Sequence, residues 1–340
     1  MKKNSSGFIL ISVYWILAFL LCFGVAMAAY ALSDLRASQR MQANLQALYL
    51  AEAGIDRTIV QLRQNYAGTA GFTNVSGGDS GTYSVQVGVL SGDRRALTAT
   101  GSSTLLATPV QRVIEAVVQK FIPPGFYDNI IWAAANLDFN GNAYSVTGNV
   151  IHGDTSPSGD MNGVHGTVTY NAAANPLPRL SFQQLYNIAQ AQGNVYDAAR
   201  LSGGPSVFPS SFWHTPPTDP ADPSTGVPNV NYITTDLVLN GNIGTIGGFF
   251  VVVGNVLTDP DASEDTTING NGQIDGAVYT TGNFRVNGGG QGLNINGGVW
   301  AGEEARLNGH ATLTYNSSYM DAIEAMDIGA DVQVLSWRDL

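Results

Sequence analysis

The sequence predicts an α+β fold made of three consecutive parts: a long N-terminal membrane-spanning helix, a small antiparallel β-sheet, and a mainly-β solenoid domain with a helical and loop insertion. Three observations predict this class. Residues 8–32 contain no charged side chain, short alternating segments follow between residues 83 and 118, and a repeat of about 20 residues dominates the chain beyond residue 130.

Changes in composition, and proline and glycine at the ends of expected elements, divide the chain into further parts. Pro123-Pro124-Gly125 marks the main boundary, because proline and glycine end regular elements. The expected parts are a leader peptide at 1–7, the transmembrane part of the helix at 8–32, its amphipathic continuation at 33–65, the small sheet at 66–122, and the solenoid domain at 123–340 with its insertion at about 172–235.

The first apolar run predicts a retained membrane anchor. Roughly 20 apolar residues in a helix span the hydrocarbon core of a bilayer, and residues 8–32 exceed that length. A secretory signal has a shorter apolar core, although Ala26-Met27-Ala28 imitates a cleavage site and leaves a cleaved signal as the alternative. Lys2 and Lys3 precede the span and favour a cytoplasmic N-terminus, so we expect the bulk of the chain to be exported.

Apolar residues at helical spacing continue the helix beyond the span. They are Met41, Leu45, Leu48, Ile55, Ile59 and Leu62. Glu52 falls within this stripe, and a buried carboxylate is costly unless it is paired. We therefore expect Glu52 to pair with a neighbouring subunit or to fix the packing of the following domain; the alternative is a half-exposed position from which Glu52 reaches solvent.

Gly7-Phe8, followed by the span and by the Ala51-Glu52-Ala53-Gly54 segment, resembles the N-terminal module of PilX-type type IV pilus assembly proteins. The resemblance covers about the first 65 residues. It implies cleavage after Gly7 by a prepilin peptidase, methylation of Phe8, a place in the inner membrane, and assembly with other pilins or pseudopilins through the helix. One departure is Ser12, which stands at the fifth mature position, where most pilins carry glutamate.

The segment after the helix predicts a small antiparallel sheet. Tyr83, Val85 and Val87 alternate with polar residues, and further short strands are expected at 97–101 and 110–118. A long helix followed by such strands is the layout of pilins, to which the N-terminal module is similar. One face of the sheet is then expected to pack on the apolar stripe of the helix.

The C-terminal part contains internal repeats. Residues 137–142 resemble residues 237–242, and residues 275–279 align with residues 296–300 at an offset of 21 residues. Short strands joined by Asn-Gly corners predict a β-helix or bactofilin-like solenoid of five or six rungs, in which each unit buries its apolar face on the next. An antiparallel β-sandwich is the alternative.

The insertion interrupts these repeats. Leucine, isoleucine and alanine at helical spacing predict a helix within 176–196, and a stretch rich in proline, glycine and serine follows. Phe208, Phe212 and Trp213 lie in this stretch, where exposed aromatic rings would bind a partner or a glycan; the alternative is that they pin the loop to the solenoid. Residues 334–338 are expected to form a closing strand that caps the last rung.

The net charge and the spacing of the titratable residues exclude some classes of function. A net charge of −11 argues against a nucleic-acid partner, and the histidines show no metal-ligand spacing, so no cofactor is expected. One loop is dense in carboxylates, which could hold Ca²⁺ through their oxygens; a solvated acidic turn is the alternative. Its members are Asp259, Asp261, Glu264 and Asp265.

The chain is therefore expected not to be an enzyme but a minor pilin-like or pseudopilin-like component of a type IV pilus or related secretion filament, displaying its solenoid at or near the tip. A membrane-anchored surface adhesin or glycan-binding module is the alternative. A polysaccharide-active β-helix enzyme is a third hypothesis, since acidic and basic residues occur along the repeats. Its candidate residues are Asp138, Asp275, Arg285, Glu303, Glu304 and Arg306.

Overall fold

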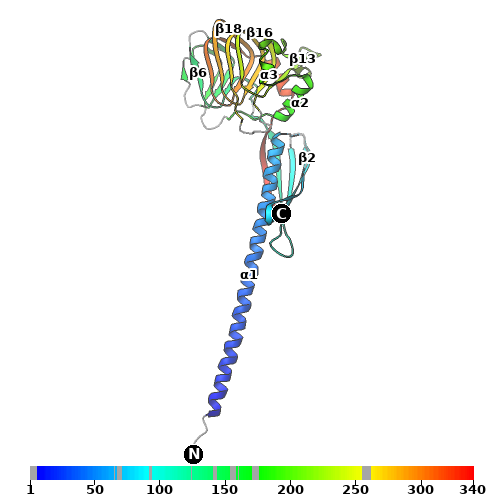
Figure 1. Cartoon of the computed structure of the whole chain (residues 1–340), viewed down its shortest axis with the longest axis vertical. Helices are drawn as coiled ribbons and strands as arrows, with labels where there is room; N and C mark the ends of the chain where they lie inside the picture. The colour runs from blue at the N-terminus through cyan, green and yellow to red at the C-terminus, as the bar shows by residue number, and fades with distance from the viewer. Residues whose placement is uncertain are drawn as a thin grey trace, which may run out of the picture. The chain divides into compact units, whose positions relative to one another are not determined.

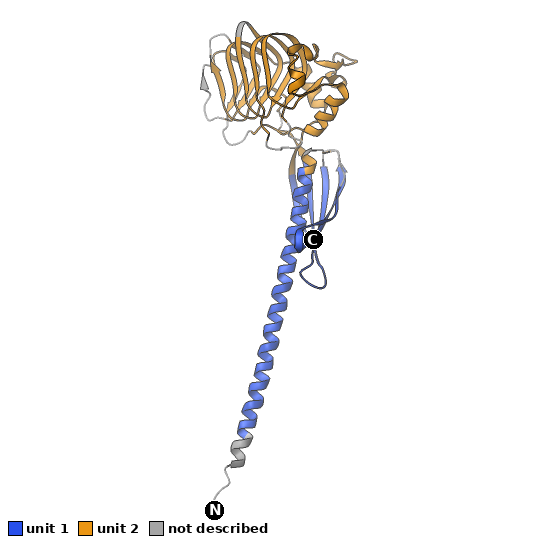
Figure 2. Cartoon of the chain, in the orientation of Figure 1, with its two compact units in different colours: residues 1–60, 69–119, 334–340 blue, residues 61–68, 120–333 orange. Residues whose placement is uncertain are grey.

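The computed structural model describes residues 6–64, 66, 71–91, 94–123, 125–140, 144–153, 158–159, 161–170, 176–254 and 262–340, leaving the side chains of 6–11, 64, 80, 91, 158–159 and 289–291 undescribed. The chain forms two compact units (Figure 2). One comprises residues 1–60, 69–119 and 334–340, and the other residues 61–68 and 120–333. The predicted α+β class is confirmed, with a long apolar N-terminal helix, an antiparallel sheet and mostly strands elsewhere.

The first unit contains helix α1 (Ser6–Gln64) up to residue 60 and most of a five-stranded sheet (Figure 1). In the order in which they pair, the strands are β1 (Phe72–Ser76), β2 (Gly81–Ser91), β3 (Arg94–Ser103), β4 (Val110–Phe121) and β20 (Asp331–Asp339), with the short helix η1 (Gly78–Ser80) between β1 and β2. β1 to β4 pair antiparallel.

The sheet packs on the C-terminal half of α1. Alternate residues of β3 and β4, among them Leu97, Ala99 and Ile114, are buried. The helix contributes small residues to this contact, such as Ala47 and Ala51, which allow the two backbones to approach closely.

The last strand corrects one expectation. Residues 334–338 do not cap the solenoid; they belong to β20, which lies next to β4 at the edge of the five-stranded sheet. The amide of Leu340 donates to the carbonyl oxygen of Val113 at 3.0 Å. Ion pairs join Arg112 to Asp339 and Arg338 to Glu115.

The second unit holds a thirteen-stranded sheet in which every described strand pairing is parallel. The short strands are β5 (Asn129–Ala133), β6 (Leu137–Asn140), β7 (Tyr144–Thr147), β8 (Asn149–His152), β9 (Ser158–Gly159), β10 (Val164–His165), β11 (Val168–Tyr170), β12 (Val195–Tyr196) and β15 (Val230–Ile233). The long strands are β16 (Leu237–Val252), β17 (Thr266–Thr280), β18 (Phe284–Ala301) and β19 (Ala305–Thr314).

The long strands stack as successive coils of a solenoid-like sheet (Figure 1). Asp275 pairs with Asn296 and Arg285 with Arg306, so the predicted offset of 21 residues is confirmed as the register of these two aligned blocks. Parallel pairing also excludes the antiparallel sandwich for these strands.

The coils do not follow the order of the chain. β19, in the last coil by sequence, pairs with β6 and β7 of the first coil, and β18 pairs with β5. β6 pairs in turn with β9. The first repeat therefore lies inside the stack, between the long strands β18 and β19 on one side and the short strands β8, β9 and β10 on the other.

Each coil contributes to three faces, which we name by their side chains. The ladder face comprises residues 237–240, 266–269, 284–287, 305–308 and 137–140. The hydroxyl face comprises residues 245–247, 273–275, 294–296, 312–314 and 145–147. The covered face comprises residues 230–233, 249–252, 277–280, 298–301 and 131–133.

The insertion packs on the covered face. Its elements and the later helix are α2 (Phe182–Gln192), α3 (Ala198–Leu201), η2 (Pro205–Val207), β13 (Trp213–Thr215), η3 (Pro223–Thr225), β14 (Val227–Pro228) and α4 (Ser317–Ala325). Leu185 of α2 and Ile323 of α4 share a buried cluster with Phe249, Tyr279 and Trp300 of the covered face. Two sides of the solenoid thus keep open surface, while the third is covered.

Candidate functional site

The N-terminal half of α1 is apolar and uncovered. Its most apolar window has no buried residue, and the helix is long and apolar enough to cross a membrane. A membrane anchor and a signal sequence share this length and composition. Gly7 and Phe8 lie in its first turn, with their side chains outside the described residues, and Ser12 is partly buried.

The Ala51-Glu52-Ala53-Gly54 segment lies where α1 contacts the sheet. A Cβ built on Gly54 would meet Cγ2 of Val85 at 2.8 Å, so the glycine permits the close approach of helix and sheet. Thr58 donates its hydroxyl to the Gly54 carbonyl oxygen at 2.8 Å. Glu52 is partly buried beside this contact, and its pairing with a neighbouring subunit stays a prediction.

The aromatic residues of the insertion are mostly buried, which favours the expectation that they pin the loop to the solenoid over the expectation that exposed rings bind a partner or a glycan. Phe208 packs edge-on against Phe250 in the solenoid interior, with ring centroids 5.3 Å apart. Phe212 is 1% exposed and stacks on Tyr319 at 4.1 Å. Trp213 is partly buried against Phe212. These rings fasten the insertion to the solenoid because burying them removes a large apolar area from water.

The acidic loop is only partly described, since Asp259 and Asp261 lie outside the described residues. Asp265 donates its amide to Oδ1 of Asp236 at 2.8 Å. Burial, a hydrogen bond with Asp236 and the negative charges of Asp236 and Asp265 raise the pKa of Glu264 to about 7. Across the described ranges, no group of three or more His, Cys, Asp or Glu side chains is placed to hold a metal ion.

Charged residues of the repeats form a chain of ion pairs along the ladder face. Nη2 of Arg306 lies 2.6 Å from Oδ2 of Asp138, and this bond raises the pKa of Arg306 above its ordinary value. Nη1 of Arg285 lies 3.6 Å from Oδ2 of Asp265, and Nε of Arg285 lies 3.8 Å from Oε2 of Glu304. Neighbouring coils are thus joined by opposite charges, and Asp138 and Arg306 are engaged with each other.

An asparagine ladder beside these ion pairs was not predicted. Asn269 donates to Asn240 at 3.0 Å, Asn287 to Asn269 at 2.8 Å, and Asn308 to Asn287 at 3.1 Å. Sequence reasoning assigned these residues to corners alone. The signal that could have found the ladder is asparagine at the same place in each repeat, since equivalent positions of stacked coils are neighbours.

The hydroxyl face carries mostly uncharged polar groups. Asp275 lies on this face, away from Arg285, and accepts from Gln273 at 2.8 Å and from Asn296 at 3.3 Å. The exposed side chains of the face include Thr147, Thr245, Asn294, Thr312 and Thr314. Such a surface offers rows of hydrogen-bond donors and acceptors at the spacing of stacked strands, about 4.8 Å.

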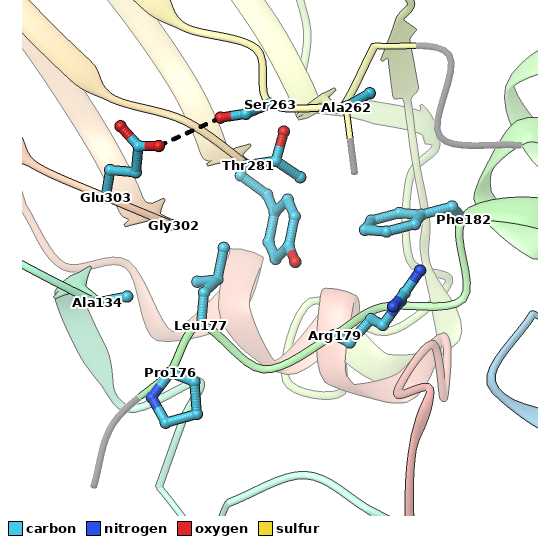
Figure 3. Close-up of a pocket in the computed structure, with 11 residues that line it drawn as sticks. Ala134, Pro176, Leu177, Arg179, Phe182, Ala262, Ser263, Thr281, Gly302 and Glu303 are labelled. Carbon is cyan, nitrogen blue, oxygen red and sulfur yellow. Dashed lines mark hydrogen bonds between the residues drawn. The ribbon is translucent and has the colours of Figure 1, made fainter. Parts of the chain in front are cut away.

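A cavity of about 380 Å³ opens beside the covered face (Figure 3). Leu177 and Phe182 supply apolar wall, whereas Arg179 and Glu303 place opposite charges in its lining. Glu303 Oε1 accepts a hydrogen bond from the Ser263 hydroxyl at 3.5 Å. This arrangement can hold a small polar molecule against apolar side chains.

Comparison with known proteins gives no family. No family model matches the sequence, and no curated protein matches it. A glycosylated ice-binding protein from an Arctic yeast is 13% identical, with a TM-score of 0.27, over 56% of this chain and 91% of that chain. An ice-binding protein from the Antarctic ascomycete Antarctomyces psychrotrophicus is 13% identical, with a TM-score of 0.30, over 58% and 99%.

The competence-associated pilin ComZ from Thermus thermophilus is 12% identical, with a TM-score of 0.27, over 87% of this chain and 97% of that chain. All three TM-scores are below 0.5, so no statement about this chain rests on these matches.

Proposed function

We propose that this chain is a minor pilin-like or pseudopilin-like structural component of a type IV pilus or related secretion filament. In this proposal α1 anchors the chain in the inner membrane before assembly and joins it to other pilins afterwards. The second unit is displayed at or near the filament tip, and no catalytic activity is assigned to the chain.

The proposal depends on one observation: the C-terminal half of α1 is covered by the sheet, and the N-terminal half is not. The C-terminal half packs on the antiparallel sheet, while the most apolar part of the N-terminal half has no buried residue. An apolar helix needs either lipid or another protein against it, because exposed apolar area is costly in water. In a pilin-like subunit, lipid covers this segment while the subunit is in the membrane, and the helices of other subunits cover it after assembly.

The second unit supports a low copy number. Residues 120–333 contain a stack of coils, the insertion and two buried apolar clusters. A domain of this size on every subunit would crowd a regular helical array, whereas a subunit at the tip has free space. Ser12 fits the same role, because the glutamate that most pilins carry at the fifth mature position meets the terminal amine of a neighbouring subunit.

Processing at Gly7 tests the proposal. The full chain with a C-terminal tag is produced in its native host as the wild type, as Gly7→Val, and as the control Gly88→Ala, a glycine of β2 whose added Cβ would have its nearest described atom 3.8 Å away. We expect mass spectrometry to find the wild type and control beginning at a methylated Phe8 and present in sheared filaments. Gly7→Val should keep residues 1–7 and be absent from filaments; normal processing and incorporation of Gly7→Val would refute the proposal.

A surface-binding module is the second candidate, favoured by the open hydroxyl face. Its amides and hydroxyls suit ligands rich in hydroxyl groups, such as glycans. Binding of the detergent-solubilised full chain to a glycan panel would test it, with Asn294→Ala/Thr312→Ala expected to weaken binding and the exposed Asp321→Asn on α4 as control. A chain that binds glycans but never enters filaments would favour this candidate over the first.

A further inference from the structure

A groove of about 530 Å³ lies within the first unit, beside α1 just after its apolar segment. The helix lines it with Arg36, Gln39, Arg40 and Asn44, and the connection between β3 and β4 lines it with residues 106–109, followed by Val110 at the start of β4. Arg36 and Arg40 are one helical turn apart and therefore share a face of α1.

The lining chemistry suits an anion. Two guanidinium groups, the amides of Gln39 and Asn44 and the hydroxyl of Thr108 can all donate hydrogen bonds. None of the nine residues that line the groove is acidic, in a chain whose net charge is −11. Asp34 lies two positions from Arg36, and side chains two apart do not face each other on a helix.

The depth of the groove matches the headgroup layer of a bilayer, if α1 is the membrane anchor of the proposed function. The uncharged run ends at Leu32. At 1.5 Å per residue, Arg36 lies about 6 Å and Arg40 about 12 Å beyond Leu32 along the helix axis. The headgroup layer is about 5–8 Å thick on each side of the hydrocarbon. Side chains on a helix tilt toward its N-terminus, so both guanidinium groups reach back toward that layer.

The loop beside the groove carries apolar side chains to the same level. Leu105 is 56% exposed, and Leu106 lines the groove beside Arg36 and Arg40. Residues 104–109 contain no charged side chain. Exposed leucines next to arginines are typical of segments that lie in the membrane interface, where the apolar groups enter the acyl boundary and the cations meet phosphates.

We propose that the groove between Arg36, Arg40 and the 104–109 loop binds the phosphate of an anionic membrane lipid and holds the first unit at a fixed depth on the bilayer. Arg36 and Arg40 donate hydrogen bonds to the phosphate oxygens, since a guanidinium group binds phosphate through two parallel hydrogen bonds. Leu105 and Leu106 contact the upper acyl chain. The inference rests on the anchoring role of α1 but adds a lipid class and a binding site to it.

Lipid binding by the detergent-solubilised full chain tests the inference. Native mass spectrometry measures retention of short-chain phosphatidylglycerol and, separately, of phosphatidylcholine and inorganic phosphate. We expect the wild type to prefer phosphatidylglycerol and Arg36→Gln/Arg40→Gln to lose affinity for it about thirtyfold, the fold-change that corresponds to about 1 kcal/mol for each of the two basic groups near a membrane surface. Arg36→Lys/Arg40→Lys keeps the charge without the paired hydrogen bonds, and its affinity should fall in between.

The charge-matched control is Arg94→Gln/Arg338→Gln, which removes two exposed arginines of the same unit. Its affinity for phosphatidylglycerol should equal that of the wild type. Equal binding of the two lipids, an unchanged affinity in Arg36→Gln/Arg40→Gln, or a preference for free phosphate over lipid would each overturn the inference.

Flotation of the same proteins with vesicles separates this inference from the proposed function. The apolar segment of α1 should carry the wild type and every variant into the vesicle fraction. Flotation without lipid preference refutes the groove and keeps the anchor, whereas failure of the wild type to float refutes both. Loss of filament incorporation with lipid preference intact would refute only the filament role.

Discussion

Gly101 of β3 lies against Ala47 of α1 so closely that a Cβ built on the glycine would stand 2.0 Å from the Ala47 carbonyl oxygen. The same Cβ would stand 2.6 Å from the amide nitrogen of Ala51. Backbone atoms cannot yield as a flexible side chain does, so the sheet and helix must separate to admit even a methyl group. This contact makes the C-terminal half of α1 part of a folded unit.

Gly101→Ala should therefore destabilise the first unit by about 3 kcal/mol, the upper end of ordinary overpacking. Hydrogen exchange of the β3 and β4 amides measures it, because a protein of two units need not unfold in one step. Gly88→Ala on β2 is the control, since its nearest atom is 3.8 Å away, and it should leave protection unchanged. Equal protection in both variants would contradict the contact.

The coil corners depend on stacked glycines. Gly276 has φ +139°, and its Cβ would stand 2.0 Å from the carbonyl oxygen of Gly248 in the neighbouring coil. Gly276→Ala combines backbone strain with a clash and should cost more than about 3 kcal/mol in the second unit.

A second glycine separates the two causes. Gly244 has φ +64° with no described atom within 4 Å of its Cβ position, and asparagine tolerates that conformation. Gly244→Asn should cost less than about 1 kcal/mol. Hydrogen exchange of the β17 amides during thermal unfolding compares the loss of stability in Gly276→Ala with that in Gly244→Asn. Similar losses in the two variants would show that the clash with Gly248 contributes little.

The asparagine ladder should contribute modestly to coil stacking. Asn287 both donates to Asn269 and accepts from Asn308, so Asn287→Ala removes two hydrogen bonds at once. Because the amides are exposed, we expect a loss of about 1 kcal/mol, measured by urea unfolding of the second unit. Asn294→Ala, an exposed asparagine of the hydroxyl face, is the control. A larger loss in the control than in Asn287→Ala would contradict a stabilising ladder.

Glu264 should make stability depend on pH. Its pKa is raised from 4.5 to about 7 by burial, by its hydrogen bond with Asp236 and by neighbouring negative charge. The folded state therefore holds its proton more tightly than the unfolded chain, so this contribution is complete below pH 4.5 and is lost as the pH rises through 7. We expect the loss to be about 1–2 kcal/mol by pH 8, because the side chain is partly exposed and screened.

Glu264→Gln keeps the shape and removes the titration. It should match the wild type at pH 4 and exceed it in unfolding free energy at pH 8, measured by urea titration at both values. Asp219→Asn, which replaces an exposed carboxylate of the insertion, is the control and should show no such crossover. A wild type whose stability rises between pH 4 and pH 8 relative to Glu264→Gln would reverse the sign and refute the argument.

Periodicity predicted the coils because stacking repeats the same environment at each offset. Asp275 and Asn296 could be aligned from sequence for this reason, and they are paired neighbours. The order of the coils could not be predicted. Each repeat carries the same alternating pattern, so the sequence does not say which strand pairs with the free edge of β19, and in the structure that strand is β6. The partner of Phe212 could likewise not be predicted, because Tyr319 is distant in sequence.

The final strand illustrates the same limit. Most residues of β20 are exposed, among them Val334, Leu335 and Trp337, so its sequence has no burial pattern that selects the five-stranded sheet over the solenoid. Its place is fixed by backbone pairing beside β4, which any extended segment can supply. Sequence reasoning therefore located the strand but assigned it to the wrong sheet.

Removal of residues 334–340 should expose the edge of β4 and weaken the first unit while the coils keep their protection. Hydrogen exchange should rise at the β4 amides and stay unchanged in β17 and β18, because the lost strand pairs with β4 alone in the described sheet order. The control Arg338→Gln/Asp339→Asn removes only the two exposed ion pairs and should cost less than about 1 kcal/mol. If truncation instead increased exchange in the coils and left β4 protected, the strand would stabilise the solenoid after all, as the sequence alone had indicated.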